Sequence, residues 1–168
     1  YGISNTLAVK IYQTYQERLY QVMQTNPYRL AEDIVGVGFK MADEIASKIG
    51  IHTDSDYRIA SGTLYVLLQA IQEGHVYLPK DILLERSHQL LGVDIPNIEA
   101  VLSNMMMDKK IVIKTQDDVQ MVYAGRYYYM ELNCARMLLA LHESVQAVSS
   151  TNEKKMLEDI DRIADKQG

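Results

Sequence analysis

The chain has 168 residues, of which 48% are hydrophobic and 23% are charged, and its formal net charge at pH 7 is −5. This composition is typical of a globular protein, and no apolar run approaches the ~20 residues that cross a membrane, so we expect no membrane partner. The single cysteine, Cys134, excludes an internal disulfide and favours a reducing compartment, so we expect a cytoplasmic protein.

The negative charge is unevenly distributed along the chain. Residues 1–50 contain five basic and five acidic side chains, which cancel, so the whole acidic excess belongs to the remainder. Proteins that bind nucleic acid usually carry a basic surplus. We therefore expect any anion-binding surface to lie within the first fifty residues.

An internal repeat occupies this neutral segment. The stretch GVGFKMADEI (36–45) aligns with GISNTLAVKI (2–11), at an offset of 34 residues, as G-apolar-small-x-x-x-A-x-x-I. Each glycine turn precedes a segment with apolar side chains at helical spacing, which predicts a helix with one apolar face. These side chains are Ala42, Ile45, Ala46 and Ile49 in the second copy, and Ala8, Ile11, Tyr12, Tyr15, Leu19 and Val22 in the first.

A short helix is predicted before the second turn. In NPYRLAEDI (26–34), Asn26 has the position of an N-cap and Pro27 that of the first helical residue. The second copy is therefore helix, glycine turn, helix. The first copy lacks its leading helix because the chain begins inside the motif, so we expect a fragment of a larger protein.

The second turn has the features of a phosphate site. Glycine permits positive φ and close approach of a ligand, and the next helix begins with unpaired amides that favour an anion. Lys40 would add a positive charge, whereas Asp43 and Glu44, expected in the first helical turn, would oppose a phosphate. Contacts of this kind position a nucleic-acid backbone without reading its sequence.

These residues resemble the helix-hairpin-helix family of DNA-binding modules. More specifically, NPYRLAEDIVGVGFKMADEIA and the later EGHVYLP resemble the N-terminal region of RecD-like (RecD/TraA family) ATP-dependent DNA helicases. Ser4 departs from the family pattern, which has a second glycine there. The hairpin amides and lysines form the candidate site: Gly36, Val37, Gly38, Phe39, Lys40 and Lys48, with Gly2 and Ser4 as a weaker second site.

The second half predicts a winged-helix-like subdomain. A helix through residues 58–74 closes at Gly74, the strand HVYL (75–78) stops at Pro79, and a helix through residues 80–92 ends at Gly92. A further helix runs from Pro96 to Asp108. The strands IVIK (111–114) and VQMVYA (119–124) follow, joined by the loop TQDD (115–118).

The predicted subdomain is poorly suited to DNA. The helix that would enter the major groove, Pro96 to Asp108, contains no lysine or arginine, and the wing loop is acidic. We predict protein docking or a scaffold role instead. The run Met105, Met106 and Met107 is expected to fill irregular core space, or to place one methionine at an interface.

The last segment predicts a long helix and then a linker with a marginal helix, which a missing neighbour would order. Tyr127, Tyr128 and Tyr129 cannot all face one way in a helix, so we interpret them as staples between elements rather than base-stacking residues. We interpret Cys134, which lies among apolar neighbours, as a small core residue.

Catalytic motifs are missing from the sequence. There is no Gly-Lys-Ser or Gly-Lys-Thr of a P-loop, and the four histidines and one cysteine have no metal-ligand spacing. We therefore predict no catalytic residue, no metal and no cofactor in this chain. The resemblance implies ATP and Mg for the parent helicase.

The fold expected is mainly α: tandem helix-hairpin-helix units (1–54), a winged-helix-like α+β subdomain with a small antiparallel sheet (55–126), and a helical bridge toward a helicase motor (127–168). The resemblance implies a non-catalytic, DNA-backbone-binding accessory module of a 5′-to-3′ helicase in DNA repair or recombination. Its partners would be single-stranded or forked DNA, without sequence preference, and the motor domains. The alternative is a protein-docking module with no DNA affinity of its own.

Overall fold

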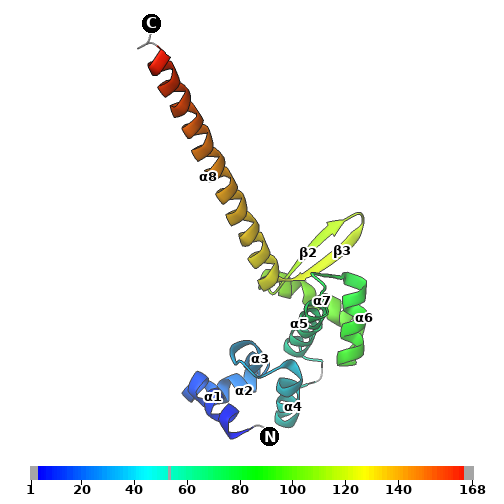
Figure 1. The fold of residues 1–168 in the computed structure, drawn as a ribbon. Coiled ribbons are helices and arrows are strands. Elements are labelled where there is room, and N and C mark those ends of the chain that lie inside the picture. The colour runs from blue at the N-terminus through cyan, green and yellow to red at the C-terminus, as the bar shows by residue number, and fades with distance from the viewer. Residues whose placement is uncertain (1–3, 53, 165–168) are drawn as a thin grey trace. The chain divides into compact units, whose positions relative to one another are not determined.

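The fold is that of a computed structural model, which describes residues 4–52 and 54–164. The chain divides into two compact units, residues 1–126 and residues 127–168. It is mainly helical, with one small three-stranded antiparallel sheet and a long C-terminal helix (Figure 1). This confirms the fold class predicted from the sequence.

The first unit begins with the helices of the repeat. They are α1 (Asn5–Tyr15), the 3-10 turn η1 (Gln16–Arg18), α2 (Leu19–Thr25), α3 (Arg29–Asp33) and α4 (Phe39–Ile49). The predicted continuous helix through Val22 is wrong, because Gln16 has φ 47° and ψ −124°, which no α-helix can accommodate. Of the predicted stripe, Ile11 and Tyr15 are buried, whereas Tyr12 is 63% exposed.

The short helix before the hairpin begins slightly later than predicted. Helix α3 starts at Arg29 rather than at Pro27, which lies in the preceding turn. Asn26 nevertheless has a capping role, because its Oδ1 accepts a hydrogen bond from the Tyr28 amide at 3.1 Å. The Tyr15 hydroxyl donates to Oδ2 of Asp33 at 2.7 Å, which ties α1 to α3.

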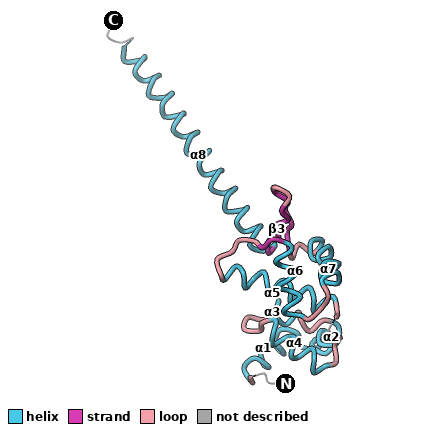
Figure 2. Tube along the Cα trace, turned by 90° about the vertical axis from the view of Figure 1, so that its right-hand side faces the viewer, coloured by secondary structure: helices cyan, strands magenta, loops and turns pink. Residues whose placement is uncertain are grey.

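The remainder of the first unit has the predicted order of helices and strands. It consists of α5 (Asp56–Gln72), β1 (Leu78–Pro79), α6 (Lys80–Leu91), α7 (Ile95–Met107), β2 (Ile111–Gln116) and β3 (Val119–Ala124). The sheet has the order β1-β3-β2, and the β2–β3 hairpin extends away from α6 and α7 (Figure 2).

Three details of this part differ from the prediction. Strand β1 has only two residues and includes Pro79, which an edge strand tolerates because the missing amide is not needed there. Helix α7 begins at Ile95 and ends at Met107. The wing loop is not TQDD but the two-residue turn Asp117–Asp118, with φ of 48° and 63° at the two aspartates.

The two predicted subdomains of the first unit share one core. The Phe39 ring of α4 lies 6.0 Å from the Tyr28 ring and 5.6 Å from the Tyr65 ring of α5. Gly62 lets this packing close, because a Cβ there would lie 3.1 Å from Cζ of Phe39 and 2.5 Å from Cδ2 of Leu91. The division between residues 1–54 and 55–126 stays a prediction from the sequence.

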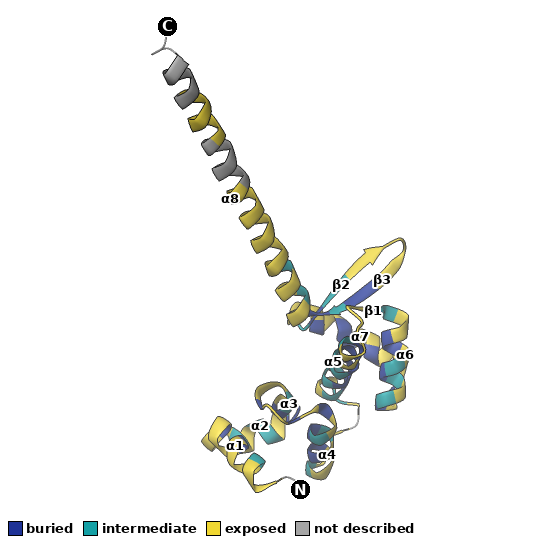
Figure 3. Ribbon diagram, viewed as in Figure 1, coloured by how far each residue is buried: buried dark blue, intermediate teal, exposed yellow. Residues whose placement is uncertain are grey.

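Helix α8 (Gly125–Ala164) forms the second unit from Tyr127 onward. Its described side chains are mostly exposed (Figure 3), and Cys134 is exposed with them, so the prediction of a core cysteine is wrong. In the described residues, the second unit has no other element that could cover this helix. No helix in the described part of the chain is long and apolar enough to span a membrane.

Candidate nucleic-acid interface

The hairpin between α3 and α4 is closed by its own backbone. The Ile34 amide donates to the Leu30 carbonyl at 3.2 Å, and the Val37 amide donates to the Ile34 carbonyl at 3.1 Å. Gly36 has φ 103°, a conformation that side chains with a Cβ rarely adopt. The turn itself therefore requires the first glycine of the pair.

The second glycine has a different environment. Gly38 is the N-cap of α4 in an extended conformation, with φ −98° and ψ 171°, and a Cβ built there would meet nothing within 4 Å. Neither the backbone nor the neighbouring atoms of the chain require glycine at this position. Its effect is to keep the approach to the start of α4 open.

The amides at the start of α4 are available to a ligand. The first helical hydrogen bond of α4 runs from the Ala42 amide to the Gly38 carbonyl, at 3.1 Å, so the amides of Phe39, Lys40 and Met41 have no intrahelical acceptor. Gly38 has no side chain to cap them. Together with the positive end of the helix dipole, these donors favour an anion.

The side chains of the predicted hairpin residues are not all accessible to a ligand. Val37 and Phe39 are only 5% and 4% exposed, so their side chains belong to the core, and the Val37 amide is already bonded within the turn. Gly38 and Phe39 can contribute only backbone atoms to a site. Sequence reasoning missed Val35, which is 91% exposed at the hairpin tip and lies outside the repeat pattern.

The two predicted lysines are not brought together. Lys40 is exposed in the first turn of α4, and among the residues described it has no ion-pair partner. Lys48 lies in the last turn of the same helix, about 12 Å farther along at ~1.5 Å per residue. Its ammonium pairs with Glu44 at 2.6 Å, which lowers the pKa of that carboxyl.

The acidic residues of α4 oppose a phosphate less than predicted. Helix α4 has no acidic residue in its first turn, so that expectation for Asp43 and Glu44 is wrong. Arg58 binds both Asp43 oxygens, Nε to Oδ1 at 2.8 Å and Nη2 to Oδ2 at 3.1 Å. The Tyr28 hydroxyl also donates to Oδ1 at 2.8 Å.

The pKa shifts of Arg58 and Tyr28 agree with the hydrogen bonds that both side chains make to Asp43. The hydrogen bond to Asp43 raises the pKa of Arg58, although burial works against it. Burial, and then the hydrogen bond to Asp43, raise the pKa of Tyr28 well above its ordinary value. The phenol therefore remains a donor, and the negative charge of Asp43 is compensated within α4 and α5.

In the first copy of the repeat, the side chain of Ser4 occupies one amide at the start of the helix. Gly2 lies outside the described residues. Ser4 is the N-cap of α1, and its Oγ accepts a hydrogen bond from the Leu7 amide at 3.3 Å. This bond occupies a donor of the kind that stays open in α4, so the two copies of the repeat differ in their capacity for a ligand.

Outside the hairpin, we looked for possible metal ligands and for basic surface in the described residues. Within residues 4–52 and 54–164, no three His, Cys, Asp or Glu side chains lie together as a metal site. The wing residues Asp117 and Asp118 are exposed, and α7 contains no lysine or arginine. The hairpin before α4 is therefore the strongest candidate for a nucleic-acid contact.

A comparison with known protein families identifies a relationship for the N-terminal part of the chain. Residues 1–77 match the family described as the "ATP-dependent RecD2 DNA helicase HHH domain". The match covers both copies of the repeat and all of α5. It confirms the resemblance to RecD-like helicases for this part of the chain.

Proposed function

Starting from the match of residues 1–77 to the helix-hairpin-helix domain of RecD2 helicases, we propose that this chain is a non-catalytic, DNA-backbone-binding accessory module of an ATP-dependent helicase. The open amides of Phe39, Lys40 and Met41 hold a phosphate, and the Lys40 ammonium adds charge. The site does not distinguish DNA sequences, because the amides and the Lys40 ammonium contact a phosphate of the DNA backbone.

One observation carries this proposal. Gly38 is a glycine that the fold does not need, placed at the N-terminus of a helix whose first amides have no intrahelical acceptor. A hairpin that served only as a turn would need Gly36, but a better capping residue could replace Gly38. Close approach of an external group accounts for its presence.

The rest of the chain has a supporting role in the proposal. The acidic wing and α7 are unsuited to phosphates, so the winged-helix-like part docks against the motor domains of the parent enzyme. Those domains use ATP and Mg, move 5′ to 3′ along a single strand and act in the cytoplasm. The exposed apolar side chains of α8, among them Met137 and Leu138, are covered by the same neighbour.

The test is fluorescence anisotropy of the chain with a labelled single strand and a forked duplex, at about 20 mM and about 200 mM salt. We expect weak binding that fades with salt. Lys40→Glu should reduce the affinity at least about tenfold and lower the salt slope by roughly one phosphate.

Lys10→Glu is the matched control, because Lys10 is an exposed lysine of α1 and its replacement changes the net charge equally. It should reduce the affinity much less than Lys40→Glu. Equal losses would indicate a diffuse charge effect rather than a site. A folded chain that binds DNA at neither salt concentration would favour the alternative, a protein-docking module without DNA affinity.

A further inference from the structure

A small cavity lies beside the hairpin. It has a volume of about 170 Å³ and is formed by residues of α3, the hairpin and α5. We call it the hairpin notch. Its wall includes Gly38 and Phe39, so it adjoins the open amides at the start of α4.

The wall of the hairpin notch is largely apolar. Ala31, Leu64, Tyr65 and Leu68 contribute partly exposed side chains to it. Glu32 is the one charged residue of the wall, and its carboxylate is paired with the Lys110 ammonium at 2.6 Å. The notch is therefore suited to a flat, uncharged group rather than to a second phosphate.

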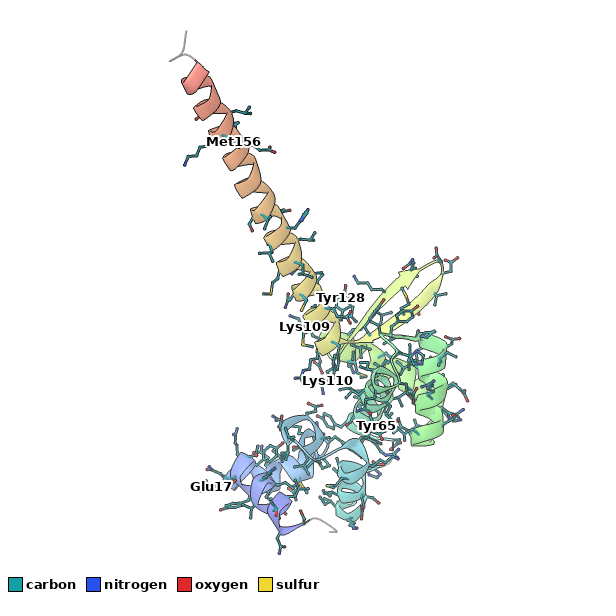
Figure 4. The ribbon with its side chains drawn as sticks, viewed as in Figure 1. Glu17, Tyr65, Lys109, Lys110, Tyr128 and Met156 are labelled. Carbon is teal, nitrogen blue, oxygen red and sulfur yellow. The ribbon has the colours of Figure 1, made fainter. Side chains whose placement is uncertain are left out.

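Tyr65 gives the notch an aromatic side. Its ring packs against Phe39 at 5.6 Å, and its hydroxyl accepts a hydrogen bond from Nε2 of Gln69 at 2.9 Å. Both contacts fix the ring where α5 meets the N-terminal helices (Figure 4). Fixed aromatic rings beside a backbone-binding groove are the usual means by which proteins contact unpaired bases.

We propose that the hairpin notch receives the base of the nucleotide whose phosphate the hairpin amides hold. This inference rests on the proposed function. A cavity of about 170 Å³ is large enough for one sugar or one base but not for a base pair. A duplex would have to unpair and unstack a base to fill it, which costs free energy, so the module prefers an unpaired strand.

A larger cavity between α3, α5 and α7 supports no comparable assignment. Its volume is about 810 Å³, but its wall contains three acidic residues and two basic ones, of which Lys110 already pairs with Glu32. It includes none of the hairpin amides. Unlike the hairpin notch, it does not combine an apolar wall with the proposed phosphate contact.

The test compares a labelled single strand of thymidines with a blunt duplex of equal length, about 12 nucleotides. Ala31→Leu fills the notch from its wall without touching the amides of α4. We expect it to weaken single-strand binding about tenfold and duplex binding less than about twofold. Ala100→Leu, on an exposed position of α7, is the matched control and should change neither.

A second readout reports on the base itself. When 2-aminopurine replaces a thymidine of the strand, its fluorescence should change on binding to the original chain and to Ala100→Leu but not to Ala31→Leu. A thermal melt monitored by circular dichroism checks that each variant is folded. Should Ala31→Leu unfold the chain, Leu68→Ala, which removes apolar wall, should weaken single-strand binding selectively.

The outcomes of these experiments distinguish this inference from the proposed function on which it rests. The proposal for the notch is overturned if the original chain binds single strand and duplex with equal affinity, or if a folded notch variant has no selective effect. Lys40→Glu would still reduce binding in that case, because it tests the proposed function. An original chain that binds no DNA overturns both.

Discussion

At the residue scale, the two hairpin glycines have separate tasks. Gly36 occupies a backbone conformation with φ 103°, whereas Gly38 has φ −98° and open space where a Cβ would lie. The backbone conformation of the turn requires the first glycine. The second leaves open space at the start of α4.

Replacing each glycine should therefore have a different effect. Gly36→Ala should lower the free energy of unfolding by about 1–2 kcal/mol, because a Cβ is strained at positive φ. Gly38→Ser should leave that free energy unchanged or raise it by a few tenths of a kcal/mol, because serine is a better N-cap. DNA affinity should fall, since the new hydroxyl takes the Met41 amide as Ser4 takes that of Leu7. Urea denaturation and anisotropy measure the two effects, and a Gly38→Ser chain with full DNA affinity would argue against the open amides.

The sequence predicted the hairpin but not the partners of its side chains. The glycine spacing is local, so the turn and α4 followed from it. The pairing of Asp43 with Arg58 and Tyr28 was not predicted, because each partner lies 15 residues away. Lys48 was included in the site by its sign of charge, although a helix rise of ~1.5 Å per residue places it at the far end of α4.

At the element scale, the wing is shorter and tighter than predicted. Strands β2 and β3 pair from Ile111 with Ala124 to Gln116 with Val119, which leaves Asp117 and Asp118 as the whole turn. Both have positive φ, the conformation of a two-residue hairpin turn that favours Asn-Gly. The sequence did not predict the two-residue turn, because Thr115 and Gln116 are polar like loop residues although they lie in β2.

Substituting the turn tests both its geometry and its distance from DNA. The double change Asp117→Asn with Asp118→Gly should raise the free energy of unfolding by about 0.5–1 kcal/mol, because it relieves a side chain at positive φ. It also removes two negative charges. DNA affinity should nevertheless stay within about twofold, since the wing lies away from the strand in the proposed function. A clear rise in affinity, at unchanged fold, would place the wing near the phosphates.

The interruption of the first helix at Gln16 also could not be predicted from the pattern of apolar residues. The apolar spacing from Ala8 to Val22 is compatible with one helix, yet the chain breaks at Gln16, whose φ is 47°. The break lets the Tyr15 hydroxyl reach Asp33 while the chain turns into α2. The helical spacing of apolar residues indicates which side chains share a face, but it does not indicate where the backbone turns.

At the scale of the whole molecule, the hairpin region is joined to the helices that follow it. Arg58 of α5 binds Asp43 of α4, and its Nη1 donates to the Leu91 carbonyl at the end of α6 at 2.9 Å. Lys110 pairs with Glu32 of α3 across 78 residues of sequence. These contacts explain why residues 1–126 form one compact unit, although their sequence patterns suggest two.

Loss of Arg58 should weaken the whole unit. Arg58→Ala should lower the free energy of unfolding by about 1–3 kcal/mol, because the half-buried Asp43 keeps only the Tyr28 hydroxyl as a donor and the Leu91 carbonyl loses the guanidinium. The matched control is Arg86→Ala, whose pair with Glu73 is 40% and 55% exposed and should contribute less than about 1 kcal/mol. Tyrosine fluorescence and circular dichroism should follow one common transition in urea. Separate transitions, or a larger effect of Arg86→Ala, would contradict the coupling.

The exposed position of Cys134 has a practical consequence. It is the one cysteine of the chain and its side chain is open on α8. A maleimide dye would therefore attach at a single known position, with no other thiol to remove. Its emission would report directly on whatever surface comes to cover that helix when other domains or proteins are added.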